Sequence, residues 1–123
     1  MAQRYIPEIR QGDKRIIVLN GEPLGAVLRV PLEFETRGNI HVGGQCVKTE
    51  VTERDREICA DLAPLLRADG LYFVGLDVIG SFLTEVNVTS PTGIQEINAL
   101  NGARLESQVI DFVESQVEKL AKI

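Results

Sequence analysis

The pattern of apolar positions in the first part of the chain predicts a β-hairpin. The stretch "KRIIVLNGEPLGAVLRV" places a run rich in apolar and β-branched residues on each side of Asn20-Gly21. Asn-Gly favours a tight turn between two strands, because both residues tolerate the left-handed backbone that such a turn needs. We therefore expect strands near residues 14–19 and 24–30.

A second hairpin is predicted by the stretch "VGLDVIGSFLTEVNVTSPTG". Its apolar runs indicate strands near residues 71–79 and 82–88, joined at Gly80-Ser81. Polar side chains inside such strands need a reason, because most positions around them are apolar. Three residues interrupt the apolar pattern in this way: Asp77, Glu85 and Asn87.

The register of this hairpin decides whether the polar residues meet. Glu85 and Asn87 are two positions apart, so they share one face of the strand. A three-residue loop would place Asp77 directly opposite Glu85, whereas a two-residue loop would place it on the other face. Opposed carboxylates repel unless a positive charge lies between them, and with an amide carbonyl they form a set of hard oxygen donors suited to Mg²⁺. A polar face turned towards water explains the same spacing, so both interpretations stay open.

Two amphipathic helices are also predicted. Thr52 is a suitable N-cap for a helix from about residue 53 to 69, bent near Pro64, with Cys59 in the core. A long final helix begins near Ala103, and its apolar residues fall on one face at 3.6 residues per turn. These are Leu105, Val109, Phe112, Val113, Val117 and Leu120. The expected fold class is α+β, an antiparallel sheet with the two main helices on one face.

The segment between the first hairpin and the first helix has no clean period. After Pro31 it is rich in glycine and polar residues, with at most a short strand around 47–50. Structureless loops of this length are uncommon inside compact domains, and those that occur are often lids or binding loops. Its length therefore points to function.

Composition narrows the class of protein. With 123 residues, 44% hydrophobic and 25% charged, the chain has the size and balance of one soluble domain. A net charge of -5 gives no electrostatic reason to bind nucleic acid or anionic lipid. The start "MAQRYIPEIR" lacks a signal-peptide core and no apolar run could span a membrane, so a cytoplasmic location is expected. Cys46, Cys59 and His41 fit neither a disulfide framework nor a zinc site.

Four longer stretches of the chain carry a family resemblance: "YIPEIRQGDKRIIVLNGEPLGAVLRVP", "ETRGNIHVGG", "LYFVGLDVIG" and "LTEVNVTSPTGIQEI". Together they resemble the carboxy-terminal part of the prokaryotic glutathione synthetases, which are ATP-grasp ligases. The resemblance implies a reaction in which ATP activates γ-glutamylcysteine as an acyl phosphate, which the amine of glycine then attacks. It also implies Mg²⁺, with Mn²⁺ as the alternative, at the ATP phosphates.

The resemblance also implies roles for individual residues. The implied metal ligands are Asp77, Glu85 and Asn87. The arginines implied to contact phosphates or substrate carboxylates in catalysis are Arg15, Arg29 and Arg37. Residues implied to bind ATP or substrate are Gly38, Asn39, Gly43, Gly44, Asn87, Ser90 and Thr92.

The loop around Arg37 resembles the flexible lid that closes over the acyl phosphate in this family. Such a lid excludes water, so that the activated carboxylate meets the amine before it is hydrolysed. The best-known members carry a Gly-Gly pair ahead of "ETRGN", where this chain has Glu33-Phe34. This difference from the best-known members bears on the flexibility and the contacts of the lid. The lid is expected over about residues 32–46.

The resemblance covers one part of a longer enzyme. We expect residues 1–123 to form a single carboxy-terminal subdomain, half of an ATP-grasp fold, without the amino-terminal substrate domain and the small subdomain. Such a chain should be inactive as a ligase by itself. The surface that would contact the absent domains is exposed, which favours a homo-oligomer. Two alternatives stay open: an ATP-grasp ligase for another amino-acid or peptide substrate, and a non-catalytic binding module.

Overall fold

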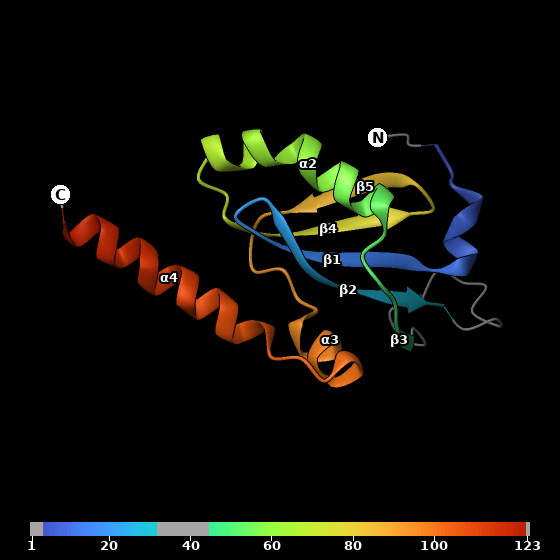
Figure 1. Ribbon diagram of the computed structural model, residues 1–123. Coiled ribbons are helices and arrows are strands. Elements are labelled where there is room, and N and C mark those ends of the chain that lie inside the picture. Colours follow the sequence, from blue (N-terminus) through green and yellow to red (C-terminus); the bar gives the residue numbers. More distant parts are fainter. Residues whose placement is uncertain (1–3, 32–44, 123) are drawn as a thin grey trace.

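The computed structural model describes residues 4–31 and 45–122 (Figure 1). Within these residues, strands form one antiparallel sheet in the order β3-β2-β1-β4-β5. The strands are β1 Asp13–Leu19, β2 Glu22–Val30, β3 Gln45–Lys48, β4 Phe73–Ile79 and β5 Phe82–Asn87. The helices are the 3-10 turn η1 Pro7–Gln11, α2 Glu53–Ala68, α3 Ile94–Asn101 and α4 Leu105–Ala121.

The first predicted hairpin is confirmed, and it supplies the middle of the sheet. β1 pairs with β2 on one side and with β4 on the other. Asn20 and Gly21 form the turn in the left-handed region, with φ of 52° and 81°. A Cβ on Gly21 would lie 2.8 Å from the Cβ of Ala63, so the turn also packs closely against α2.

The second hairpin is confirmed too, with a register that neither predicted loop describes. Ile79 pairs with Phe82 across the two-residue turn, yet Asp77 pairs with Glu85. A β-bulge between these positions leaves Thr84 unpaired and shifts the rest of β5 by one residue. The Thr84 hydroxyl donates to the Asp77 carbonyl at 3.1 Å, on the strand that it faces. The bulge therefore opposes the carboxylates that a plain two-residue loop would separate.

Helices cover both faces of the sheet, so the prediction that the two main helices share one face is wrong. Ile16 and Val18 pack in the core cluster that includes α2. Ile17, between them, packs in a second cluster with Ile97 of α3 and Leu105 at the start of α4. The physical reason is that β1 is apolar on both sides, and a central strand with a continuous apolar run must be covered on each face. The predicted antiparallel α+β sheet itself is confirmed.

The helix α2 begins as predicted. The Thr52 hydroxyl accepts from the Asp55 N–H at 3.2 Å and the Asp55 carboxylate accepts from the Thr52 N–H at 2.9 Å, which completes a capping box. The helix continues through Pro64 to Ala68. Cys59 is 1% exposed, which confirms it as a core residue.

The helix α3 was not predicted, because it is short and rests on distant contacts. Ile97 is its one fully buried residue, and it packs over Gly25 of β2. A Cβ on Gly25 would lie 3.1 Å from Ile97 and 3.2 Å from Leu105, so the missing side chain lets α3 and the start of α4 approach the sheet. A helix of this length depends on tertiary packing.

The predicted final helix is confirmed, but most of its apolar face is not covered. Leu105 is buried, and Phe112 meets Tyr72 edge to face with ring centroids 5.4 Å apart. From there α4 extends beyond the sheet (Figure 1). Four apolar residues on it are 48–69% exposed: Ile110, Val113, Val117 and Leu120. Among the described residues, no helix has the length and apolarity to cross a membrane.

Candidate functional site

A row of charged side chains crosses the face of the sheet that α3 partly covers. The strand register creates the row, because Arg15 of β1 lies opposite Asp77 of β4, and Asp77 lies opposite Glu85 of β5. In the other direction, Asp13 of β1 lies opposite Arg29 of β2. Side chains two apart on a strand share a face, so Asp13 and Arg15 belong to the same row.

The Asp77 carboxylate lies between two guanidinium groups. The Arg15 Nε donates to Asp77 Oδ1 at 2.6 Å and its Nη2 donates to Oδ2 at 3.2 Å. The Arg29 Nη2 lies 3.3 Å from Asp77 Oδ1 and also donates to the Asp13 carboxylate. Asp77 and Arg15 are only 6% and 5% exposed. A buried charge needs this kind of pairing, because an unpaired one would be costly.

The pairing fixes the charge state of the cluster. Burial by itself would raise the pKa of the Asp77 carboxyl, but the hydrogen bonds and charge of Arg15, and then the charge of Arg29, outweigh burial and hold that pKa below its usual range. Burial would lower the pKa of Arg29, but Asp13 and then Asp77 more than compensate and raise it. Both groups are therefore ionised at neutral pH.

The predicted metal ligands lie together on this face. Asp77 opposes Glu85, and Asn87 opposes Gly75, two positions along β4. Glu85 is exposed, and the Asn87 Oδ1 accepts from the Thr89 N–H at 3.1 Å. Two carboxylates and an amide oxygen fit a hard divalent cation by their chemistry. Within residues 4–31 and 45–122, no three His, Cys, Asp or Glu side chains form a metal-binding group, so the amide is needed to complete a set of three.

Two arginines already offset the carboxylate repulsion from which a metal was expected. Repulsion between Asp77 and Glu85 was the reason to expect a cation between them. Arg15 and Arg29 already supply positive charge at Asp77, at 2.6 Å and 3.3 Å. The fit of a metal therefore rests on the donor set and on the exposed position of Glu85.

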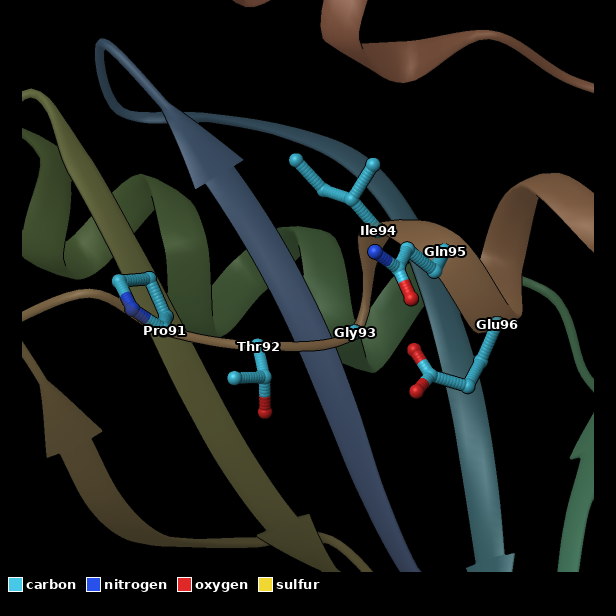
Figure 2. Close-up of a pocket in the computed structure, with 6 residues that line it drawn as sticks. All are labelled: Pro91, Thr92, Gly93, Ile94, Gln95 and Glu96. Carbon is cyan, nitrogen blue, oxygen red and sulfur yellow. The ribbon is translucent and has the colours of Figure 1, made fainter.

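The segment after β5 returns across the charged row. The Arg15 Nη1 donates to the Thr92 carbonyl at 2.9 Å, and Pro91 is buried. Figure 2 shows this segment crossing β4 and β1, with α2 on the far side of the sheet. It forms one wall of an open pocket of about 300 Å³ lined by Pro91, Thr92, Gly93, Ile94, Gln95 and Glu96. Ser90 and Thr92 were both predicted to meet substrate, and both are exposed; Thr92 lines the pocket, and Ser90 directly precedes the lining segment.

The predicted site residues thus divide into two groups. The first group comes together in the charged row and consists of Arg15, Arg29, Asp77 and Glu85. The other predicted residues of β5 and of the segment after it follow Glu85 along the chain. The predicted lid residues lie outside the described part of the chain: Arg37, Gly38, Asn39, Gly43 and Gly44.

Sequence reasoning missed Asp13 and Glu96. Asp13 holds Arg29, and its position two residues before Arg15 was the signal that could have placed it on the same face. Glu96 lines the pocket from α3, which had no strong local signal of its own.

Comparison with known sequences gives a consistent result. The chain matches the prokaryotic glutathione synthetase ATP-grasp domain over residues 1–102. It is 62% identical over 113 residues to the glutathione synthetases of Thermosynechococcus vestitus and Gloeobacter violaceus, and 50% identical over 116 residues to that of Agrobacterium fabrum. These alignments cover 92%, 92% and 94% of this chain, but 36%, 35% and 36% of the relatives. The chain thus spans about a third of their length.

Comparison with solved structures agrees on the fold. The chain is similar to the ATP-grasp ligase PsnB, solved in complex with a minimal precursor, with a TM-score of 0.58 and 14% identity over 86% of this chain and 35% of that one. At this identity the likeness shows the ATP-grasp fold alone. The sequence match extends over most of the chain and includes every strand and the charged row. The chain therefore belongs to the prokaryotic glutathione synthetase ATP-grasp family.

Proposed function

We propose that this chain is the carboxy-terminal part of an ATP-dependent ligase that joins γ-glutamylcysteine to glycine. The observation that carries the proposal is the charged row of two arginines, a buried carboxylate and the exposed Glu85, in which Arg15 bonds Thr92 in the wall of an open pocket. Family membership and 50–62% identity to glutathione synthetases support the choice of reaction. ATP, γ-glutamylcysteine and glycine are then the ligands.

Arg29 is the residue best suited to stabilise the negative charge that develops in such a reaction. Its side chain is 36% exposed, whereas Arg15 is buried. Its Nη2 contacts the carboxylates of Asp13 and Asp77, so the guanidinium group is held in place. A donor already in place lowers the barrier when an oxygen gains charge, because the protein need not reorganise. We assign Arg29 to the transferring phosphoryl group or the acyl oxygen.

The donors Asp77, Glu85 and Asn87 would hold a divalent cation, for which we propose Mg²⁺, with Mn²⁺ as the alternative. Such an ion supplies positive charge at the ATP phosphates. Mg²⁺ usually relies on phosphate oxygens and water for its remaining positions, so the exposed Glu85 would be the ligand best suited to share the ion with a nucleotide. The cysteinyl carboxylate then displaces ADP from the γ-phosphoryl group, and the glycine amine displaces phosphate from the acyl carbon.

A chimera tests the proposal with this chain's own residues. Residues 1–123 would replace the matching segment of the Thermosynechococcus vestitus enzyme, and glutathione formation would be measured with γ-glutamylcysteine, glycine and ATP. We expect an active ligase, and a Glu85→Gln version of the chimera should lose about 100-fold or more in kcat. Activity with other acceptors alone would favour a different ATP-grasp ligase. A folded but inactive chimera would favour a non-catalytic binding module.

The finer features of the proposed ligase follow from its substrates and surface. We propose a cytoplasmic location, where ATP and γ-glutamylcysteine would both be available, and the charge of -5 gives no reason for a nucleic-acid partner. We also propose a homo-oligomer, because α4 carries an exposed apolar stripe that a second copy could cover.

A further inference from the structure

Arg15 uses all of its guanidinium nitrogens inside the protein. Its Nε and Nη2 donate to the two oxygens of Asp77, and its Nη1 donates to the Thr92 carbonyl at 2.9 Å. The residue is only 5% exposed. A phosphate ligand needs N–H groups that face the ligand. Arg15 faces the protein instead, although the sequence resemblance implied a contact with phosphate or substrate.

The backbone around Arg15 is shaped to hold this side chain. A Cβ on Gly75 would lie 3.1 Å from the Arg15 Cδ and 2.8 Å from the Pro91 Cβ. A Cβ on Gly93 would lie 3.2 Å from the Arg15 Cγ. The two glycines therefore leave a slot for the arginine, and Pro91 closes it. Figure 2 shows Pro91 and Gly93 on the segment that crosses β4 and β1.

The segment also has an uncommon backbone conformation that needs support from outside. Ser90 has a φ of 50°, in the left-handed region that residues other than glycine seldom adopt. Such a conformation persists only when surrounding contacts impose it. The hydrogen bond from Arg15 to Thr92, two residues later, and the packing of Pro91 on Gly75 are contacts of this kind.

We propose that Arg15 is a positioning residue that ties the segment 90–94 to the Asp77 carboxylate. One guanidinium group holds the pocket wall and the candidate metal ligand in a single geometry, and Arg29 is left to contact the reacting groups. The catalytic consequence rests on the proposed function. The tie itself is a property of this chain and can be tested without any ligase assay.

Hydrogen exchange of the chain measured by NMR tests the tie directly. Lysine at position 15 keeps the charge but cannot bond Asp77 and Thr92 together, so Arg15→Lys should loosen residues 92–94. The amide of Ile97, which donates to the Gly93 carbonyl at 3.0 Å, should then exchange about tenfold faster. The amides of Val74 and Leu76 should be unchanged. Arg29→Lys is the matched control, and it should leave exchange of the Ile97 amide as it is. Unchanged exchange at Ile97 in a folded Arg15→Lys variant would overturn the proposal.

A second variant keeps the test decisive if Arg15→Lys does not fold. Gly75→Ala retains both charges but pushes Pro91 away, since its new Cβ would be 2.8 Å from the Pro91 Cβ. It should speed exchange of the Ile97 amide in the same way while the sheet keeps its exchange protection. If Gly75→Ala leaves the Ile97 amide protected, the segment does not depend on the slot and the proposal fails.

Kinetics of the chimera separate positioning from catalysis. Arg15→Lys should raise the KM for γ-glutamylcysteine by about fivefold or more with a smaller change in kcat, whereas Arg29→Lys should mainly lower kcat. A fall in kcat without a change in KM for Arg15→Lys would make Arg15 a catalytic residue and overturn the proposal. If the unmodified chimera is inactive, the proposed ligase function fails, and the exchange experiment still decides whether Arg15 ties the segment.

Discussion

At the scale of single residues, the site is organised around one buried carboxylate. Asp77 satisfies two arginines at once, by hydrogen bonds from Arg15 and by a contact of 3.3 Å with Arg29. Removing its charge would leave the buried Arg15 without a counter-charge. An uncompensated buried charge lowers the stability of a protein by more than most surface substitutions do.

We therefore expect Asp77→Asn to destabilise the chain by about 3–5 kcal/mol. The measurement is the free energy of unfolding in urea at neutral pH. Glu85→Gln is the matched control, because Glu85 lies opposite Asp77 but is exposed, and it should change stability by less than about 1 kcal/mol. Equal effects of the two changes would contradict this account of the cluster.

The buried Cys59 thiol should make the stability of the chain depend on pH. Burial, followed by the negative charge of Asp55, raises the pKa of the Cys59 thiol from 9.0 to about 11. The unfolded state then loses this proton at lower pH than the folded state. The contribution of Cys59 to stability is fully present below pH 9 and is lost as the pH rises from there towards 11.

The test compares the pH dependence of unfolding in the wild type and in Cys59→Ala. Between pH 8 and pH 11 the wild type should lose about 2–3 kcal/mol more than the variant, since one pKa unit corresponds to about 1.4 kcal/mol. Other groups that titrate in this range are common to both proteins and cancel in the difference. An equal loss of stability in the two proteins would contradict a raised pKa of the Cys59 thiol in the folded state.

At the scale of elements, α4 carries two apolar sides with different surroundings. Leu105 and Phe112 face the rest of the chain. The exposed residues form a second stripe with spacings of three, four and three positions, which is the seam of a two-helix coiled coil. These residues are Ile110, Val113, Val117 and Leu120.

A second copy of the chain is the partner that we expect on this stripe. The part of α4 before Ser115 carries Glu106, Asp111 and Glu114, whereas Lys119 in the last turn and Lys122 at the C-cap follow Glu118. Antiparallel pairing of two copies would bring these opposite charges near one another. The stripe has few turns, so the association should be weak.

We expect self-association at high protein concentration in sedimentation velocity, and Val113→Glu should abolish it. Ser115→Glu is the matched control, because it adds the same charge to α4 outside the stripe and at an exposed position. Association that survives Val113→Glu would place the contact elsewhere. A monomer at every concentration would show that the isolated chain does not form the proposed homo-oligomer.

At the scale of the whole molecule, this chain forms one side of the proposed active site. It spans 35–36% of the Thermosynechococcus and Gloeobacter enzymes, so most of each relative lies outside the region that it matches. A ligase must hold nucleotide and substrate in reactive geometry, and that positioning supplies much of the rate. One side of a site cannot provide it.

The isolated chain should therefore form no glutathione from ATP, γ-glutamylcysteine and glycine above the uncatalysed background. The chimera described above is the positive control under the same conditions. Turnover by the purified chain alone would mean that residues 1–123 hold a complete active site, and it would change the assignment of the chain as part of a larger ligase.

The sequence by itself determined the two hairpins, the two longer helices and the family. Asn20-Gly21 predicted the first turn because its backbone preference is local, and Thr52 predicted the start of α2 because a cap needs only its own neighbours. For the same reason, Cys59 could be predicted as a core residue from its local sequence. Long matching stretches indicated the family, and that assignment is confirmed over residues 1–102.

Only the tertiary structure decided what the charged residues do. Arg15 and Asp77 are 62 positions apart and meet because β1 lies beside β4, while Asp77 meets Glu85 through a bulge that no local pattern indicated. Whether an arginine is buried in a tie or open to a ligand depends on which strands and segments lie over it. Strand neighbours and layer order are set by long-range burial, because the free energy of covering both apolar faces of β1 belongs to the whole sheet and to no single segment.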